Sequence, residues 1–250
     1  MVESRIIAVC GKGGVGKTSI SALMVKALLV KNKKVLVIDA DPAIGLSTAL
    51  GVAIGKTIDD IRKEVIWAGR EGSRQKQQAI LSHLNYGVLE AMAESRGFAF
   101  LAIGRPETEG CYCKVNDYLK GIIESLSADF DYVVIDGEAG IEQINRRVMD
   151  NITHLLLVSD ASRKGINVIK TIAGVAGGLI SNARVGVMLN RLTGSNELKM
   201  VDLDGMPLLA CLEEDSQIRS FDIQGRSLLE LDSRTAVELE KGLRAFDFID

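Results

Sequence analysis

The sequence is poor in aromatic residues, which make up 4% of its 250 residues, and it has only three prolines, four cysteines and two histidines. Hydrophobic residues nevertheless amount to 47%, so the core must consist mainly of aliphatic side chains. A chain of this length can bury a core large enough for one three-layer domain. The prolines fall at predicted loops or strand starts, so we predict a single domain over residues 1–250.

An excess of one charge and long apolar runs are also missing. The formal net charge is −3, which provides no general electrostatic attraction for nucleic acid. No apolar run reaches the about 18 residues that a membrane span needs, and the first residues lack the basic and apolar regions of a secretory leader. We therefore expect a cytoplasmic protein with no nucleic-acid and no membrane partner. The cysteines are too few and too unevenly spaced for a disulfide framework and are expected as thiols.

A glycine-rich loop follows the first apolar run. Residues 11–18 match the phosphate-binding pattern G-x-x-x-x-G-K-[ST] at every defined position. In such a loop the backbone N–H groups and the next helix bind phosphate, Lys17 binds the terminal phosphates, and the Thr18 hydroxyl binds Mg²⁺. The nucleotide-binding residues predicted here are Gly11, Lys12, Gly13, Gly14, Val15, Gly16, Lys17, Thr18 and Ser19.

The same glycines also fit the G-x-G-x-x-G pattern of dinucleotide-binding folds, with Asp39 in place of the ribose-binding acid. This alternative leaves Lys17 and Thr18 without a role. The phosphate-loop interpretation uses both residues and predicts a further acid at the end of a later strand, which Asp136 supplies.

Apolar runs without polar alternation recur between stretches of helical periodicity, such as 18–31 and 164–180. The runs are 5–10, 34–38, 98–103, 132–135, 154–158, 184–189 and 207–211. Because such runs suit parallel strands covered on both faces, they predict a doubly wound α/β fold with a mostly parallel sheet, the three-layer sandwich of P-loop NTPases. Residues 57–96 contain no strand run and indicate two or three inserted helices.

Carboxylates follow two of these runs. Asp39 and Asp41 end the second run and Asp136 ends the fourth, so they are expected beside the phosphate loop, at the carboxyl edge of the sheet. One such aspartate could be a helix cap, but three around one loop favour a metal site. With Thr18, Asp39 and Asp136 are predicted to hold Mg²⁺, partly through water, and Asp41 to orient the attacking water.

Two cysteines, Cys111 and Cys113, are separated by one residue before a helix expected near Val115. Two thiolates leave zinc short of its four ligands, but a two-fold symmetric dimer would supply the other two. Such a cage could hold Ni²⁺, Zn²⁺ or a small iron–sulfur cluster. Without a dimer, two small loop residues are the simpler interpretation. Cys10 and Cys211 lie in strand-like runs and are expected in the core.

The general loop pattern does not require Lys12. GKGGVGKT with this lysine resembles the deviant phosphate loop of the ATPases grouped with septum-site, plasmid-partition and nitrogenase iron proteins, which work as nucleotide-sandwich homodimers. The resemblance implies that Lys12 reaches the partner's nucleotide and that Asn190, followed by Arg191, reads adenine. The alternatives are a solvated charge for Lys12 and a turn-forming residue for Asn190. The predicted catalytic set is Lys12, Lys17 and Asp41.

Three further stretches narrow the resemblance. GRPETEGCYC at 104–113, IDGEAGIEQ at 135–143 and SDASRKG at 159–165 look like the nickel-insertion accessory ATPases of carbon monoxide dehydrogenase and acetyl-CoA synthase, the CooC and AcsF proteins. The resemblance implies hydrolysis of ATP to ADP with Mg²⁺, Ni²⁺ or Zn²⁺ on the cysteine pair, and delivery to an apo carbon monoxide dehydrogenase or acetyl-CoA synthase. Residues 207–215 depart from the Ile-Pro-x-Asp-Pro form of the broader class and leave the base pocket undefined.

Two other functions share this loop. A nitrogenase-reductase-like electron carrier would place a cluster cysteine where this chain has Gly-Glu-Ala-Gly at 137–140. A ParA- or MinD-type positioning ATPase is the other alternative. The helical stretch 238–250 is too acidic for the membrane-surface helix that such an ATPase can carry.

Overall fold

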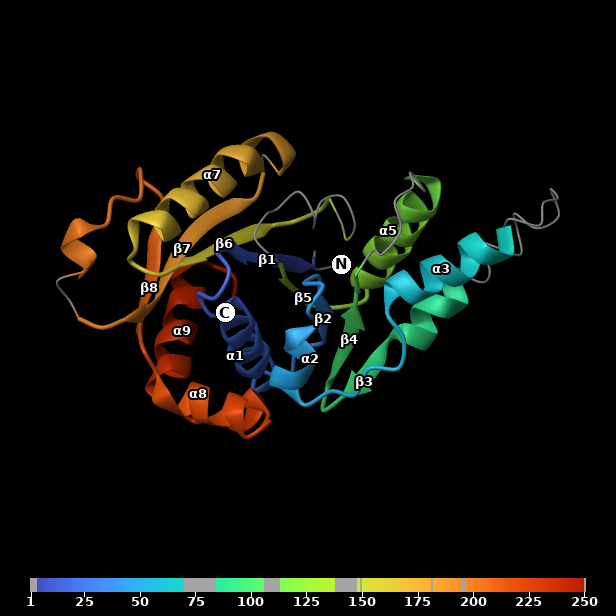
Figure 1. Ribbon diagram of the computed structural model, residues 1–250, viewed down its shortest axis with the longest axis horizontal. Coiled ribbons are helices and arrows are strands. Elements are labelled where there is room, and N and C mark those ends of the chain that lie inside the picture. Colours follow the sequence, from blue (N-terminus) through green and yellow to red (C-terminus); the bar gives the residue numbers. More distant parts are fainter. Residues whose placement is uncertain are drawn as a thin grey trace.

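The computed structural model describes residues 4–69, 84–105, 113–137, 148, 150–180, 182–194 and 197–249. Within these residues eight strands form one sheet in the order β3-β4-β2-β5-β1-β6-β7-β8 (Figure 1). All neighbouring strands are parallel except β3 and β4. This order confirms the predicted doubly wound, mostly parallel sheet.

The strands are β1 (Arg5–Gly11), β2 (Val35–Asp39), β3 (Ala93–Ser95), β4 (Phe98–Ala102), β5 (Tyr132–Asp136), β6 (His154–Ser159), β7 (Arg184–Leu192) and β8 (Leu208–Glu213). The helices are α1 (Lys17–Leu29), α2 (Gly45–Leu50), α3 (Ile58–Gly69), α5 (Cys113–Ser127), α7 (Arg163–Leu179), α8 (Ser216–Ile223) and α9 (Arg234–Ala245), with 3-10 turns η1 (Glu197–Met200) and η2 (Leu228–Glu230). Residues 84–91 are also helical. All seven predicted strands are present.

The all-helical interpretation of residues 57–96 was wrong at its end, where β3 forms. This strand pairs antiparallel with β4 through a two-residue turn, Arg96 and Gly97, with φ of 40° and 93°. Two positive φ angles are the geometry of a tight hairpin whose twist matches that of its strands. Three residues are too few to display a strand period, so no apolar run marked β3 in the sequence.

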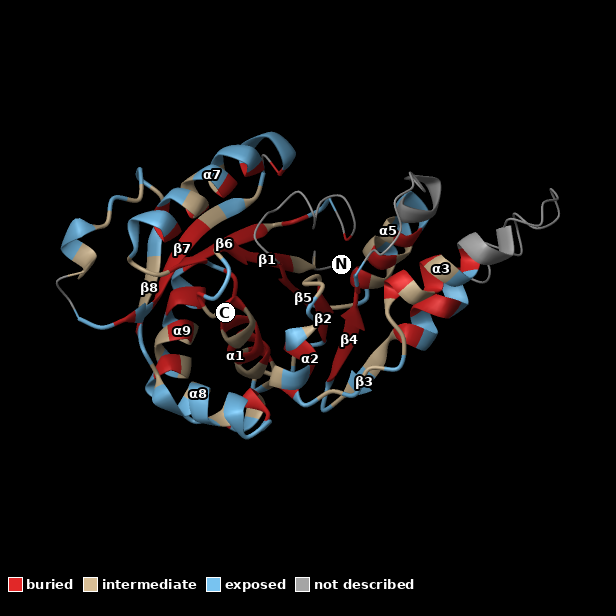
Figure 2. Cartoon of the chain, in the orientation of Figure 1, coloured by how far each residue is buried: buried red, intermediate tan, exposed pale blue. Residues whose placement is uncertain are grey.

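Each face of the sheet carries its own hydrophobic core. Ile6 and Ala8 of β1 contribute to one core, which α3, α5 and α7 cover, whereas Ile7 and Val9 contribute to the other, which α1, α2 and α9 cover. Figure 2 shows the strands buried between these helical layers. Because both faces are covered, successive strand residues are all apolar, as in the sequence runs. In the described part of the chain, every helix is too short or too polar to span a membrane.

The strand order brings three chain segments together at one edge of the sheet. β1 lies between β5 and β6, with Val9 in register with Asp136. β2 lies on the other side of β5, where Asp39 is in register with the same Asp136. The loop after β1 therefore emerges beside the carboxyl ends of β2 and β5, where open α/β sheets bind ligands.

Candidate nucleotide-binding site

The phosphate loop runs from the end of β1 to the start of α1, and its backbone requires glycine at both ends. Gly11 has a φ of 151°, and a Cβ on it would lie 2.0 Å from the carbonyl oxygen of Val158 on β6. Gly16 is the N-cap of α1 with a φ of 92°, a conformation that L-residues other than glycine rarely adopt. The loop is therefore held tightly against the sheet, with the N-terminus of α1 open to a ligand.

Lys17 and Thr18, the last two residues of the loop motif, make different contacts. Lys17 is 8% exposed, and its Nζ donates to the carbonyl oxygen of Lys12 at 3.3 Å. The Thr18 hydroxyl donates to one oxygen of Asp136 at 2.8 Å, and the Ser21 hydroxyl donates to the other at 3.0 Å. Thr18, predicted as a metal ligand, thus lies against a carboxylate predicted for the same role.

Asp39 and Asp136 are both buried at this edge. Asp39 accepts hydrogen bonds from the backbone N–H of Asp41 at 3.1 Å and of Leu46 at 2.9 Å, the latter in the first turn of α2. Burial, together with the charge of Asp136, raises the pKa of Asp39 to about 7. Burial also raises the pKa of Asp136 to about 6. Neighbouring buried carboxylates and a hydroxyl form an oxygen set that suits a hard divalent cation such as Mg²⁺.

The raised pKa values predict that the stability of the nucleotide-free protein falls with increasing pH. In the folded state Asp39 and Asp136 retain protons that the unfolded chain releases near pH 4, so the free energy of unfolding decreases between about pH 4 and pH 7. Asp136→Asn keeps a hydrogen-bonding side chain but removes one buried charge. We expect the decrease between pH 5 and pH 8 to be smaller in this variant, by roughly 2 kcal/mol.

Urea unfolding at the two pH values, in EDTA and without nucleotide, measures this difference. Asp129→Asn, which removes an exposed carboxylate outside the site, is the control. Its free energy of unfolding should decrease between the two pH values as much as that of wild type. An equal decrease in Asp136→Asn and wild type would refute the proposed buried protonation.

Asp41 lies two residues beyond Asp39 and is half-buried. Its carboxylate accepts a hydrogen bond from the backbone N–H of Ala43 at 2.9 Å, which shapes the turn leading to α2. The structure thus places Asp41 at the predicted edge and gives it a local structural contact. Its role in orienting water stays a prediction.

Lys12 has a partner within its own chain. Its Nζ lies 3.0 Å from Oδ2 of Asp160, in the turn between β6 and α7, and the two side chains are 27% and 31% exposed. Burial opposes ionisation of Asp160, but hydrogen bonds from Ser162 and Lys12 outweigh it and lower the pKa of Asp160. The structure therefore contradicts the view of Lys12 as a merely solvated charge. The pairing of Asp160 with Lys12 was missed, although an Asp two residues before a Ser helix cap is a recognisable turn pattern.

Asn190, at the end of β7, is 8% exposed and contacts the phosphate loop. Its Nδ2 donates to the carbonyl oxygen of Val15 at 2.8 Å. A Cβ on Gly16 would lie 2.6 Å from this Nδ2. The side chain therefore joins β7 to the loop. Its predicted role in reading adenine stays a prediction. Arg191, the next residue, has a φ of 59°.

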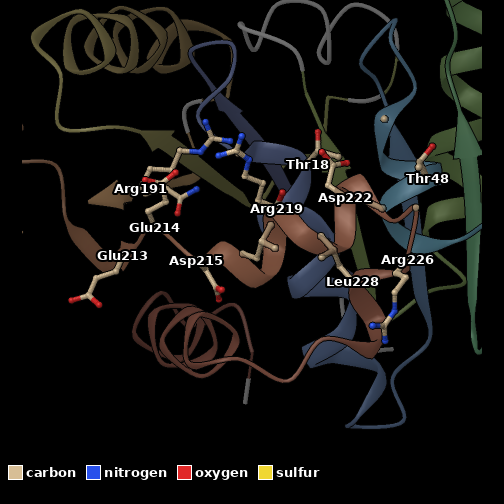
Figure 3. Close-up of a pocket in the computed structure, with 17 residues that line it drawn as sticks. Thr18, Thr48, Arg191, Glu213, Glu214, Asp215, Arg219, Asp222, Arg226 and Leu228 are labelled. Atoms are coloured by element: carbon tan, nitrogen blue, oxygen red, sulfur yellow. The ribbon is translucent and has the colours of Figure 1, made fainter. Parts of the chain in front are cut away.

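A cavity of about 500 Å³ extends from the phosphate loop to α8 (Figure 3). Its lining includes Gly16, Thr18 and Asn190 from the phosphate loop, α1 and β7, and Arg219, Asp222 and Leu228 from α8 and η2. The lining residues between Glu213 and Leu228 were not predicted as site residues. The departure of residues 207–215 from the Ile-Pro-x-Asp-Pro form left the base pocket undefined.

The predicted cysteine site falls mostly outside the described residues. Cys111 lies outside them, as do residues 138–143 of the IDGEAGIEQ stretch, and Cys113, the first residue of α5, is described only by its backbone. Within the described residues no group of three or more His, Cys, Asp or Glu side chains could hold a metal ion. Cys10 is buried in β1 as expected, whereas Cys211 in β8 is only half-buried. The Ni²⁺ or Zn²⁺ site stays a prediction.

Comparison with known proteins identifies the family of the chain. The CobQ/CobB/MinD/ParA nucleotide binding domain matches residues 6–228. An uncharacterized ATP-binding protein of Methanocaldococcus jannaschii is 36% identical over 237 residues, which cover 93% of each protein. The carbon monoxide dehydrogenase accessory protein CooC of Rhodospirillum rubrum is 28% identical over 90% of this chain and 89% of its own.

A solved structure shares the fold. The septum site-determining protein MinD of Pyrococcus horikoshii, complexed with Mg-ADP, matches with a TM-score of 0.71 and 22% identity, over 98% of this chain and 96% of that chain. The broad family predicted from the phosphate loop is confirmed, and the narrower resemblance to CooC is matched at lower identity than that to the uncharacterized protein. The chain belongs to the CobQ/CobB/MinD/ParA nucleotide-binding domain family.

Proposed function

We propose that the protein is an ATPase that binds ATP with Mg²⁺ and hydrolyses it to ADP and phosphate as a homodimer. The observation that carries this proposal is the cluster in which Thr18 contacts Asp136 directly below the phosphate loop, with Asp39 in the adjacent strand. An ATP-binding relative at 36% identity supports ATP as the nucleotide. Because Mg²⁺ neutralises charge on the phosphates, it would supply the electrostatic stabilisation that phosphoryl transfer needs.

The chain's own residues would bind the phosphates and Mg²⁺, orient the attacking water and contact the partner's nucleotide. Loop N–H groups and Lys17 bind the phosphates, and Thr18, Asp39 and Asp136 would hold Mg²⁺, partly through water. Asp41 accepts a hydrogen bond from water and directs its oxygen at the γ-phosphorus, in line with the bond to the β,γ-bridging oxygen that breaks. Lys12 of one protomer leaves Asp160 and contacts the nucleotide of its partner, so hydrolysis requires the dimer.

The wider function that we propose is metal delivery. Two protomers closed around ATP would bring their Cys111 and Cys113 pairs together into a four-thiolate site for Ni²⁺ or Zn²⁺, which is cargo for an apo carbon monoxide dehydrogenase or acetyl-CoA synthase. The similarity to CooC over 90% of the chain and the Cys-x-Cys spacing support this function. Loss of the γ-phosphate would loosen the dimer and the metal site together.

Anaerobic titration with Ni²⁺ and Zn²⁺ tests this function. Reduced protein is titrated with ADP and with a nonhydrolysable ATP analogue, while mass and bound metal are measured together. We expect one metal per dimer, lost in the double variant Cys111→Ser, Cys113→Ser but retained in Cys211→Ser, which changes a thiol in β8. A dimer that binds no metal through thiolates would leave an ATP-driven switch and remove the metal function.

The same samples separate the two alternatives. A chromophore with iron in stoichiometric amount would favour the nitrogenase-reductase-like electron carrier. ATP-dependent sedimentation with anionic liposomes or with DNA, without metal binding, would favour the MinD- or ParA-type positioning ATPase, whose fold this chain shares.

A further inference from the structure

Two arginines in the wall of the cavity have guanidinium groups with no hydrogen bond or ion pair to any residue that the structure describes. They are Arg191, after Asn190 in β7, and Arg219, in the middle of α8. In the view of Figure 3 both side chains point toward the phosphate loop. Arg226 in the same wall differs, because it lies 4.1 Å from the centre of the Phe221 ring and 3.4 Å from Glu230.

Arg191 lies next to the N-terminus of α1. A Cβ on Gly16 would lie 4.0 Å from Nε of Arg191, so this side chain crosses the N-terminus of α1. The helix terminus is itself a positive site. Two like-charged guanidinium groups beside a helix N-terminus repel one another in the absence of an anion and can bind a phosphate together.

The helix that carries Arg219 has little buried surface. None of the residues in α8 is buried, and Ile223 is 75% exposed. Its N-cap, Asp215, accepts hydrogen bonds from Gln217 N–H at 2.9 Å and from the Thr235 hydroxyl at 2.8 Å. Ile218 and Phe221 are half-buried and pack against the core that α1, α2 and α9 cover. A helix with little buried surface has low local stability, so a bound ligand can order it.

We infer that Arg219 is a nucleotide-binding residue. With Arg191 it contacts the α-phosphate at the N-terminus of α1, and this contact fixes α8 over the bound nucleotide as the outer wall of the cavity. Asp215 accepts hydrogen bonds from Gln217 and Thr235 and, among the described residues, no carboxylate forms an ion pair with Arg219. The inference rests on the proposed binding of ATP and ADP at the phosphate loop, and it is independent of the cysteines.

Calorimetric titration with ADP and Mg²⁺ tests the contact. Arg219→Ala should weaken ADP binding about tenfold, the loss expected for a charge-assisted contact at an exposed position, and Arg219→Lys should lose less. Arg234→Ala is the control, because it removes the same charge from the first residue of α9, outside this cavity. Thermal unfolding of the free variants should match wild type, since Arg219 is exposed.

Hydrogen exchange supplies a second readout. In wild type, ADP should slow exchange in both α8 and the phosphate loop, whereas in Arg219→Ala it should slow exchange in the loop alone. Unchanged ADP affinity in Arg219→Ala, or exchange in α8 that ADP does not slow in wild type, would overturn the inference. Failure of wild type to bind ADP would instead refute the proposed function, so the two failures are distinguishable.

Discussion

Replacing Lys12 with alanine should leave ATP binding within about twofold of wild type and reduce hydrolysis about a thousandfold, the scale seen when a charge that stabilises phosphoryl transfer is removed. Binding should survive because, in the proposed site, backbone N–H groups and Lys17 would make the phosphate contacts of the loop. Hydrolysis should fail because the Lys12 ammonium would be the group that crosses to the partner's nucleotide.

The contact between Lys12 and Asp160 provides the matched variant. Asp160→Asn leaves Lys12 in place but removes the charge that holds it at 3.0 Å. We expect this variant to form the ATP-bound dimer at least as readily as wild type and to keep hydrolysing. Partial exposure of both partners limits the strength of the pair, so the gain in dimerisation should be small.

Turnover, nucleotide affinity and mass are measured on both variants across a range of protein concentrations. Wild-type hydrolysis and dimerisation in Lys12→Ala would refute the sandwich dimer. Loss of nucleotide binding in the same variant would mean that Lys12 acts within its own protomer.

Gly11→Ala should lower the free energy of unfolding by about 4 kcal/mol, a large fraction of the stability of an ordinary domain. The added Cβ would lie 2.0 Å from the backbone oxygen of Val158, which cannot rotate away as a side chain could. Relieving this clash would require β1 and β6 to separate in the centre of the sheet. The loop that follows Gly11 would shift with β1, so nucleotide affinity should fall as well.

Gly13→Ala is the control within the same loop. A Cβ on Gly13 would meet no heavy atom within 4 Å, so its effect on unfolding should be below about 1 kcal/mol. Urea unfolding of the three proteins without nucleotide gives the comparison. Equal stability of Gly11→Ala and Gly13→Ala would show that the strands yield easily at this point.

The strand pattern and the site edge were predictable from the sequence for a common physical reason. A parallel strand covered on both faces is a continuous apolar run, and the first polar residue after it, such as Asp39 or Asp136, marks the carboxyl end. Since parallel strands end at one edge, these acids and the loop before Thr18 had to meet. Neither step requires knowledge of the packing between helices.

The parts that escaped prediction depend on tertiary structure or on very short elements. β3 has three residues, and its hairpin depends on a positive φ at Arg96. Arginine is not a residue type that indicates such a turn. The contact of Lys12 with Asp160 spans 148 positions and exists only because β1 and β6 are neighbours. Arg219 lies on a helix without buried residues, so no hydrophobic pattern pointed to its place in the cavity.

The hydrogen bond from Asn190 to Val15 makes the far end of β7 a structural support of the loop that would grip the phosphates. A substitution at that strand end therefore cannot tune the preference for one base without also altering the shape of the phosphate cradle. Truncating Asn190 would therefore leave the Val15 carbonyl without its side-chain partner and loosen the loop whichever base the protein binds.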